Sequence, residues 1–226
     1  MKHSWLLLLF IVDLLAELLA IEYSLHSVRP ATKPLLMTCL VAYTLAQHFA
    51  DSKIKRYLLL ALLFSLAGDL FLLFDREGSS NFIFGLLSFL LAHIFYIVLF
   101  IYCRKKQMLK GWNLLIAISL LIYVASFFYL LSPKLGSLKI PVLIYALVLG
   151  GMLLCAWHAF DRKHRIVRPL VISGAVLFVL SDSLLAINKF YHAFPYSGIA
   201  VMTTYALAQL LITIGITTHA RSLNIP

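Results

Sequence analysis

The chain is a succession of apolar runs separated by short polar clusters, and each run is 18 to 23 residues long. A helix needs roughly 20 apolar residues to cross the ~30 Å hydrocarbon core of a bilayer. The runs are continuously apolar and do not alternate with polar residues, which favours helices over a β-barrel. Breaking the chain at its polar clusters predicts eight membrane-spanning helices, at residues 5–22, 31–49, 57–74, 82–102, 112–131, 140–160, 169–188 and 197–219.

The composition agrees with a membrane protein, because 62% of the residues are hydrophobic against roughly 45 to 50% in an ordinary soluble domain. The gaps between the runs are too short for a separate soluble domain, so we expect a single integral membrane domain over residues 1–226. The first run contains Asp13 and Glu17 and lacks a convincing small-x-small cleavage site, which predicts a retained helix rather than a signal peptide. The predicted fold class is therefore an all-α, polytopic bundle of eight transmembrane helices.

The distribution of Lys and Arg predicts how the chain is oriented in the membrane. The connectors on one side, together with the termini, carry thirteen: Lys2, Lys53, Lys55, Arg56, Arg104, Lys105, Lys106, Lys110, Arg162, Lys163, Arg165, Arg168 and Arg221. The other side carries six: Arg29, Lys33, Arg76, Lys134, Lys139 and Lys189. The positive-inside rule then places both termini in the cytoplasm, in a multi-pass protein of the cell (inner) membrane.

The net charge of +10 does not indicate a nucleic-acid partner, because the basic residues lie in short connectors instead of on one folded face. Anionic lipid headgroups, and membrane lipids in general, are the better expectation. The sequence indicates no oligomeric state. Cys39, Cys103 and Cys155 have no C-x-x-C spacing, which argues against a disulfide framework and against a thiolate metal site.

Two carboxylates lie inside otherwise apolar runs. Asp69 is the only charged residue of Tyr57–Phe74, and Asp182 is the only charged residue of Pro169–Ile187. A carboxylate at such a depth costs roughly 2.5 to 3.5 kcal/mol on insertion scales, so it is retained for a partner or for a task. The predicted orientation puts both in the halves of their helices nearer the extracytoplasmic face. A structural role remains the alternative for this pair.

An internal repeat relates the two aspartates. The sequence FSLAGDLFLLF in the third run resembles FVLSDSLLAIN in the seventh, and LAH at residues 91–93 resembles LAQ at residues 207–209. The pairs are four runs apart, so the halves share one direction and form a candidate parallel four-plus-four repeat, unlike the inverted repeats of many transporters. Such a repeat would place Asp69 and Asp182 in equivalent positions about a pseudo-two-fold axis.

Other polar residues accompany the aspartates on the third, fourth, seventh and eighth runs. Gly85, Phe89, His93 and Tyr96 recur at helical intervals, which predicts one stripe facing the bundle. The candidate substrate-binding residues are Lys33, His93, Asn188, Lys189, Tyr205 and Gln209. The histidine, tyrosine and glutamine have an alternative role as hydrogen-bonding contacts between helices, and the lysines as interfacial anchors.

Asp13 and Glu17 lie one helical turn apart, where like charges repel. They must be paired, protonated or turned toward a wet cavity, and a catalytic role for them stays open. No G-x-S-x-G elbow, H-x-x-x-H or H-E-x-x-H pair, phosphate-binding glycine loop or dinucleotide fingerprint occurs. The absence of a metal-binding histidine pair weakens the alternative that Asp69, Asp182 and His93 bind a metal. We therefore assign no metal ligands. General acid and base chemistry remains, with one buried carboxyl protonated and the other ionised.

The stretches LAGDLFLLF, GLLSFLLAHIFY, IPVLIYALVLGGM, LSDSLLAINKF and TYALAQLLI together resemble the YhhN family of lysoplasmalogenase-like membrane proteins. The resemblance covers nearly the whole chain, and SDS-x-x-A-x-NKF and Y-x-x-AQ-x-L are its most specific parts. It implies an eight-span hydrolase that cleaves the vinyl ether bond of lysoplasmalogens, releasing a fatty aldehyde and glycerophosphocholine or glycerophosphoethanolamine. The paired aspartates of the family would be Asp69 and Asp182, with a lysophospholipid as the substrate and no cofactor.

Two other function classes remain open at this point. Intramembrane acids also serve as proton relays in proton-coupled transporters, although spans broken by Gly or Pro at the acids, as transporters often have, are missing here. A lipid-binding protein without turnover fits the composition equally well. The choice of headgroup, and which aspartate is the acid and which the base, cannot be read from the sequence.

Overall fold

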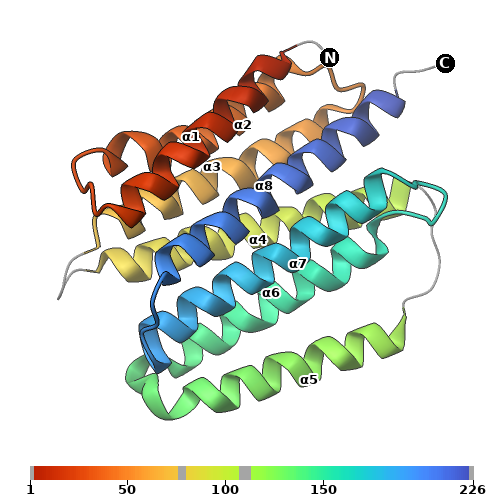
Figure 1. The fold of residues 1–226 in the computed structure, drawn as a ribbon. Helices are drawn as coiled ribbons and strands as arrows, with labels where there is room; N and C mark the ends of the chain where they lie inside the picture. The colour runs from red at the N-terminus through yellow and green to blue at the C-terminus, as the bar shows by residue number, and fades with distance from the viewer. Residues whose placement is uncertain (1–2, 76–79, 107–112, 224–226) are drawn as a thin grey trace.

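The structure, a computed structural model, describes residues 3–75, 80–106 and 113–223, and the side chains of Lys105 and Lys106 are left undescribed. Within these ranges eight α-helices lie side by side along one common direction (Figure 1). They are α1 (Ser4–Glu22), α2 (Arg29–Ala46), α3 (Ser52–Leu73), α4 (Asn81–Lys106), α5 (Leu114–Leu131), α6 (Lys139–Ala159), α7 (Val167–Ala186) and α8 (Ser197–Ser222). Two single 3₁₀ turns, Ser132–Lys134 and Gly136–Leu138, connect α5 to α6, and a π-helical turn, Ile187–Tyr191, follows α7.

The all-helical bundle expected from the apolar runs is confirmed, and each run corresponds to one helix. Several helices extend beyond their runs into polar sequence: α3 starts at Ser52 because Asp51 caps it by accepting a hydrogen bond from the Lys53 amide at 3.0 Å. Asn113 caps α5 in the same way, so that helix begins at Leu114, and the predicted first residue of its run, Trp112, lies outside the described residues.

Seven of the eight described helices are long and apolar enough to cross a membrane, which makes the protein a multi-pass integral membrane protein. The exception is α2, whose first turns contain Arg29 and Lys33. Its span is therefore expected from its place in the bundle, between α1 and α3, and not from its composition. That this helix crosses the membrane stays a prediction.

The tightest helix pairs are α3 with α4 and α7 with α8. Gly174 on α7 shows why the second pair packs so closely, since a Cβ at this position would lie 2.9 Å from the carbonyl oxygen of Ala208. Helix α5 is the opposite case, because only Val124 and Leu131 of its residues are buried, and Figure 1 shows it at the edge of the bundle. Its exposed leucines and tyrosines form a surface suited to lipid.

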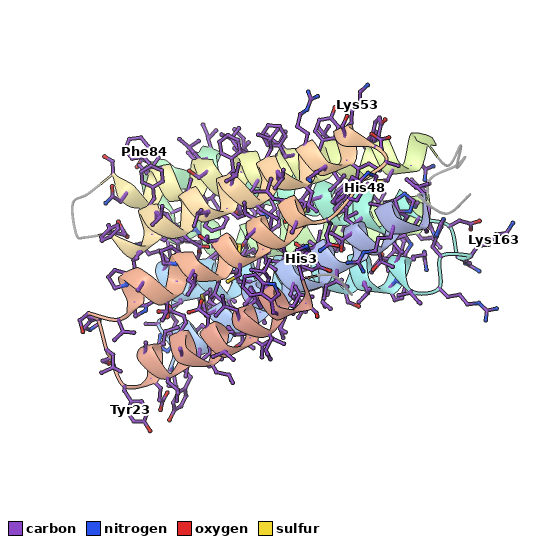
Figure 2. All side chains as sticks on the ribbon, turned by 90° about the horizontal axis from the view of Figure 1, so that it is seen from above. His3, Tyr23, His48, Lys53, Phe84 and Lys163 are labelled. Carbon is purple, nitrogen blue, oxygen red and sulfur yellow. The ribbon has the colours of Figure 1, made fainter. Side chains whose placement is uncertain are left out.

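Both termini lie at the same end of the bundle (Figure 1). Seen from above, Tyr23 and Phe84 mark the opposite end, and Lys163 projects from the terminal end (Figure 2). Asp69, Asp182 and the π-helical turn belong to the end marked by Tyr23. Which face of the membrane this end meets stays a prediction, and Lys2, Arg76 and Lys110, which enter the charge count, lie outside the described residues.

Candidate active site

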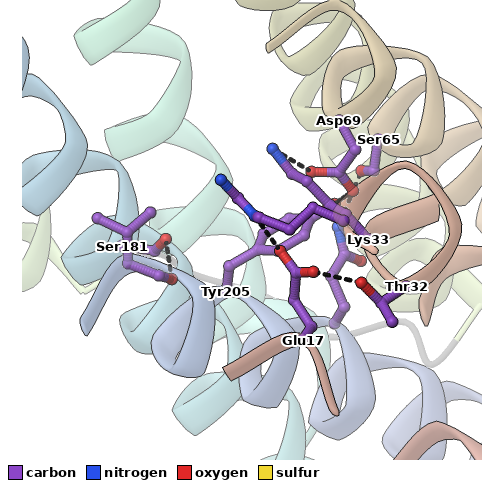
Figure 3. A network of polar contacts seen from close by, with 10 residues as sticks. Glu17, Thr32, Lys33, Ser65, Asp69, Ser181 and Tyr205 are labelled. Atoms are coloured by element: carbon purple, nitrogen blue, oxygen red, sulfur yellow. Dashed lines mark hydrogen bonds and ion pairs between the residues drawn. The ribbon is translucent and has the colours of Figure 1, made fainter. Parts of the chain in front are cut away.

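Asp69 lies near the end of α3 with only 2% of its surface exposed. The Tyr205 hydroxyl on α8 donates a hydrogen bond to Oδ2 at 2.7 Å, and the Lys33 ammonium on α2 lies 3.8 Å from Oδ1. Figure 3 shows these side chains converging from three helices. The ammonium and the donated hydrogen bond both favour the ionised carboxylate, so they reduce the cost predicted for Asp69 in an apolar helix.

A second acid belongs to the same polar network. Glu17 on α1 is fully buried; Arg29 Nε donates to it at 3.1 Å and the Thr32 hydroxyl at 2.5 Å (Figure 3). Of the alternatives that the sequence left open for Asp13 and Glu17, Glu17 is therefore paired. Asp13, one turn earlier, is buried, and its Oδ2 has no hydrogen-bond partner among the described residues.

Asp182 lies in the last turns of α7 and has a different environment. The Tyr145 hydroxyl on α6 donates a hydrogen bond to Oδ2 at 2.5 Å. His93 on α4 places Nε2 at 3.6 Å from the same oxygen, too far for a hydrogen bond. The imidazole is fully buried and packs edge-on against the rings of Tyr145 and Phe178, so Tyr145 is what orients this carboxyl.

Both aspartates line one polar cavity of about 240 Å³. This polar cavity is bounded by the C-terminal ends of α1, α3 and α7 and the N-terminal parts of α2, α4 and α8. Its other charged and polar lining residues are Arg29, Lys33, Asp75, Ser181, Asn188, Lys189, Ser197 and Tyr205.

An apolar chamber lies next to the polar cavity, between α4, α5, α6 and α7. Its lining is aromatic and aliphatic, and includes Tyr123, Phe127 and Phe128 on α5 and Leu149 on α6. Asp182, together with Leu72, Phe82, Phe89 and Leu185, lines both spaces, whereas Asp69 lines only the polar cavity. Asp182 therefore stands where a polar space meets an apolar one.

Phe89 forms part of the wall between the two spaces, and Gly68 sets its position. A Cβ at Gly68 would lie 2.6 Å from the Phe89 ring, so the aromatic side chain can approach α3 only because this residue lacks one. On its other side the Phe89 ring meets the Tyr205 ring edge-on, with centroids 5.7 Å apart. The stripe of Gly85, Phe89, His93 and Tyr96 is buried as predicted.

The predicted substrate-binding residues divide into two groups. Lys33, Asn188, Lys189 and Tyr205 line the polar cavity. Lys189 also pairs with Asp75 at 3.0 Å. His93 and Gln209 belong to neither lining: Gln209 accepts a hydrogen bond from Tyr96 on α4 and donates one to Ser65 on α3, at 2.5 and 2.8 Å. Gln209 therefore has the position of a hydrogen-bonding contact between helices, the alternative considered for it from the sequence, whereas neither ring nitrogen of His93 has a hydrogen-bond partner among the described residues.

Arg29, Asp75 and Tyr145 are among the site residues that were not singled out from the sequence. Arg29 enters only the charge count, Asp75 lies in a connector, and Tyr145 is one of 11 tyrosines, in a run that also contains His158. The signal for Arg29 was its place one turn before Lys33, which puts both cations on one face of a helix. Nothing in the sequence pointed to Tyr145.

The partners of the two aspartates agree with the four-plus-four repeat. Asp69 on α3 is contacted from α2 and α8. Asp182 on α7 is contacted from α6 and α4. The repeat pairs α3 with α7, α2 with α6 and α8 with α4, so the two carboxyls receive their partners from equivalent helices, while the chemistry of those partners differs.

Two carboxyls facing one cavity can deliver and accept protons, and the cations that line the cavity can hold an anionic group. No group of three His, Cys, Asp or Glu close enough to hold a metal ion occurs in the ranges that the structure describes.

Comparison with known proteins gives consistent results. Human lysoplasmalogenase TMEM86A is 33% identical over 160 residues, which cover 68% of this chain and 62% of the relative. A lysoplasmalogenase of Mycobacterium bovis is 30% identical over 189 residues, 83% of this chain and 69% of the relative. Human lysoplasmalogenase TMEM86B is 32% identical over 154 residues, 68% and 60% of the two chains.

The matched part of this chain thus spans about three fifths of the length of the human relatives. No solved structure gives a significant match. The profile of the YhhN family matches residues 28–216, which include both aspartates and every described residue of the polar cavity except Ile21. The chain therefore belongs to the YhhN family.

Proposed function

We propose that this protein is a lysoplasmalogenase, which hydrolyses the vinyl ether bond of a lysoplasmalogen to a fatty aldehyde and a glycerophosphocholine or glycerophosphoethanolamine. The similarity to proteins named lysoplasmalogenase supports this activity. The single observation that carries it to this chain is the position of Asp182, a carboxyl that lines both a polar cavity and an apolar chamber.

The substrate, like the site, has a polar part and an apolar part. A lysoplasmalogen joins a phosphorylated glycerol to a long alkenyl chain, and the bond to be cleaved lies where the two meet. Arg29, Lys33 and Lys189 at the polar cavity provide charge for the phosphate. The apolar chamber provides hydrocarbon-like surroundings for the chain, which reaches it from the membrane past the loosely packed α5.

The reaction needs an acid and a base. Protonation of the vinyl ether at the alkene carbon farther from the ether oxygen gives an oxocarbenium ion, which water captures as a hemiacetal, and the hemiacetal separates into aldehyde and alcohol. An aspartic acid can donate the proton, and an aspartate can stabilise the cation and take a proton from water. The two aspartates can perform these steps without a metal or an organic cofactor.

The test is release of aldehyde by the purified protein in detergent, measured with and without a chelator. A lysoplasmalogen should give aldehyde, while the monoacyl, diacyl and saturated-ether analogues should not. Asp69→Asn and Asp182→Asn, which keep the side-chain shape, should each lower the rate by about 10²- to 10⁴-fold, the usual contribution of a general acid or base. No aldehyde from well-folded wild-type protein would refute the proposal, and pH-gradient-driven solute flux into proteoliposomes would then favour a transporter.

A further inference from the structure

We infer that the two aspartates have separate tasks: Asp182 is the general acid that protonates the alkene carbon, oriented by Tyr145, and Asp69 is the carboxylate that stabilises the cation and takes a proton from water. This division rests on the proposed function and assigns the roles within it. It follows from three features of the described residues: the spaces that the two side chains face, the groups that contact them and the different packing of the two halves.

The first feature is the geometry of the two spaces. In a vinyl ether the carbon that takes the proton is the one farther from the ether oxygen, and so lies on the alkenyl side. The acid must therefore reach into the space that holds the chain. Asp182 lines the apolar chamber as well as the polar cavity, whereas Asp69 lines only the polar cavity, where water and the glycerol part would lie.

The second feature is the charge around each carboxyl. Asp69 faces the Lys33 ammonium from α2 and the Tyr205 hydroxyl from α8, and the nearby Glu17 on α1 is itself paired with Arg29. Each aspartate accepts a hydrogen bond from a tyrosine, so the group that distinguishes Asp69 is the Lys33 ammonium, which favours a carboxylate. The polar groups in contact with Asp182 are the Tyr145 hydroxyl from α6 and the His93 ring from α4, of which the ring is buried between aromatic side chains. Asp75 and Lys189, paired with each other, line the polar cavity beside it.

The third feature is the difference between the two outer helices. The repeat pairs α1 with α5, yet six residues of α1 are buried, from Leu6 to Ala20, against two of α5. Helix α1 thus closes the bundle beside Asp69, with Glu17 inserted into the polar network. Helix α5 packs more loosely, so that the apolar chamber remains as a space beside Asp182. The two aspartates that the repeat relates therefore lie in different surroundings, Asp69 on a polar side of the bundle and Asp182 on an apolar side.

The steps then balance. Asp182 gives its proton to the alkene carbon farther from the ether oxygen, and the oxocarbenium ion forms on the ether carbon facing the Asp69 carboxylate. Water attacks that carbon and its released proton passes to Asp69. When the hemiacetal separates, Asp69 returns this proton to the departing glycerol oxygen, and the hemiacetal hydroxyl gives its proton to Asp182 as the aldehyde forms. Both side chains end in their starting states, and one water has been consumed.

A deuterium-exchange experiment separates the roles. Asp69→Asn and Asp182→Asn protein is incubated with a lysoplasmalogen in D₂O, and the unhydrolysed substrate is recovered for mass spectrometry. With Asp182 intact but water capture impaired, protonation reverses, so the Asp69→Asn protein should place deuterium on the alkene carbon farther from the ether oxygen. The Asp182→Asn protein should not. Exchange by Asp182→Asn, by both variants or by neither would overturn the division, provided that wild-type protein releases aldehyde; failure of the wild type would instead refute the proposed function.

A matched pair of variants tests the two tyrosines as positioning residues. Each of Tyr145→Phe and Tyr205→Phe removes one hydroxyl that donates to one aspartate. The alkaline limb of the pH–rate profile reports loss of the acid's proton, and the acidic limb reports protonation of the base. Tyr145→Phe should displace the alkaline limb alone and Tyr205→Phe the acidic limb alone. The reversed pattern, displacement of the same limb by both variants, or unmoved limbs would overturn the assignment.

Discussion

The ammonium nitrogen of Lys33 lies 3.8 Å from a carboxylate oxygen of Asp69, between helices α2 and α3, and both side chains are almost fully withdrawn from solvent. Removing one partner of a buried ion pair leaves the other charge uncompensated, at a cost of about 3 to 5 kcal/mol, whereas removing both is often nearly neutral. The first prediction follows from this asymmetry.

Lys33→Met should lower the thermal stability of the detergent-solubilised protein, and Lys33→Met combined with Asp69→Asn should recover most of the loss. The measurement is a double-mutant cycle on the unfolding midpoint of the wild type, both single variants and the double variant. If the change in the unfolding midpoint of the double variant equalled the sum of the changes in the two single variants, the two side chains would not be coupled.

The second prediction concerns the wall between the two spaces. Gly68→Ala would bring a Cβ within 2.6 Å of the Phe89 ring, so the ring must move; overpacking of this kind costs about 1 to 3 kcal/mol. We expect lower stability and a lower rate of aldehyde release, because Phe89 lines both spaces.

The matched control for this change is Gly151→Ala on α6, where the nearest atom to a new Cβ is Ile97 Cδ1 at 3.8 Å. This variant should be neutral or slightly more stable, because alanine favours a helix by about 1 kcal/mol over glycine. Adding Phe89→Leu should relieve part of the damage from Gly68→Ala. A Gly68→Ala protein that matched the control in both stability and rate would refute the proposed role of Gly68.

Much of this architecture follows from the apolar pattern, since run length and continuity predict eight helices and the structure has one helix for each run. The pattern also pointed to Asp69 and Asp182, because a charge within an apolar run is visible in one dimension. The helix boundaries were less predictable. Caps such as Asp51 extend a helix into polar sequence, where hydropathy gives no signal.

The surroundings of the aspartates could be predicted only in part. Tyr145 and Phe89 are aromatic residues in apolar runs, and only the crossing of the helices places one at a carboxyl and the other between two spaces. His93 and Gln209 occupy matching positions in the repeat and were predicted together as polar interior residues. Both side chains are buried, but neither lines the polar cavity or the apolar chamber. Which space a buried side chain faces depends on the rotation of its helix, and sequence spacing alone does not fix that rotation.

The third prediction tests that placement for Gln209. Its side chain links α8 to Tyr96 on α4 and to Ser65 on α3, so Gln209→Ala leaves buried polar groups unpaired at a cost of about 1 to 3 kcal/mol each. The unfolding midpoint should fall clearly, while turnover per folded molecule should fall far less than in Asp182→Asn. Full loss of turnover with an unchanged midpoint would instead give Gln209 a direct role with substrate.

The fourth prediction tests the apolar chamber as the site of the alkenyl chain. Ala146 on α6 lines the chamber, so Ala146→Phe should fill part of it and lower the rate most for substrates with the longest chains. Leu147, the next residue, is exposed on the outer side of the same helix, and Leu147→Phe is the control. Rates for a series of chain lengths decide the matter, and an equal response of both variants would place the chain elsewhere.

The fifth prediction concerns the side of the membrane from which the polar cavity is reached. The thirteen-to-six distribution of Lys and Arg puts both termini in the cytoplasm. The cavity belongs to the other end of the bundle, where the connector between α1 and α2 lies. Headgroup and water should therefore reach Asp69 and Asp182 from the extracytoplasmic side.

Two single cysteines can establish this orientation, in a background from which the three buried native cysteines, Cys39, Cys103 and Cys155, have been removed. Ser27 lies exposed in the connector at the cavity end, and Ser222 lies exposed at the end of α8. A membrane-impermeant thiol reagent applied to intact cells should label Ser27→Cys and spare Ser222→Cys, which should react only after the cells are opened. The opposite labelling would reverse the topology and place the cavity mouth in the cytoplasm, where the charge distribution does not put it.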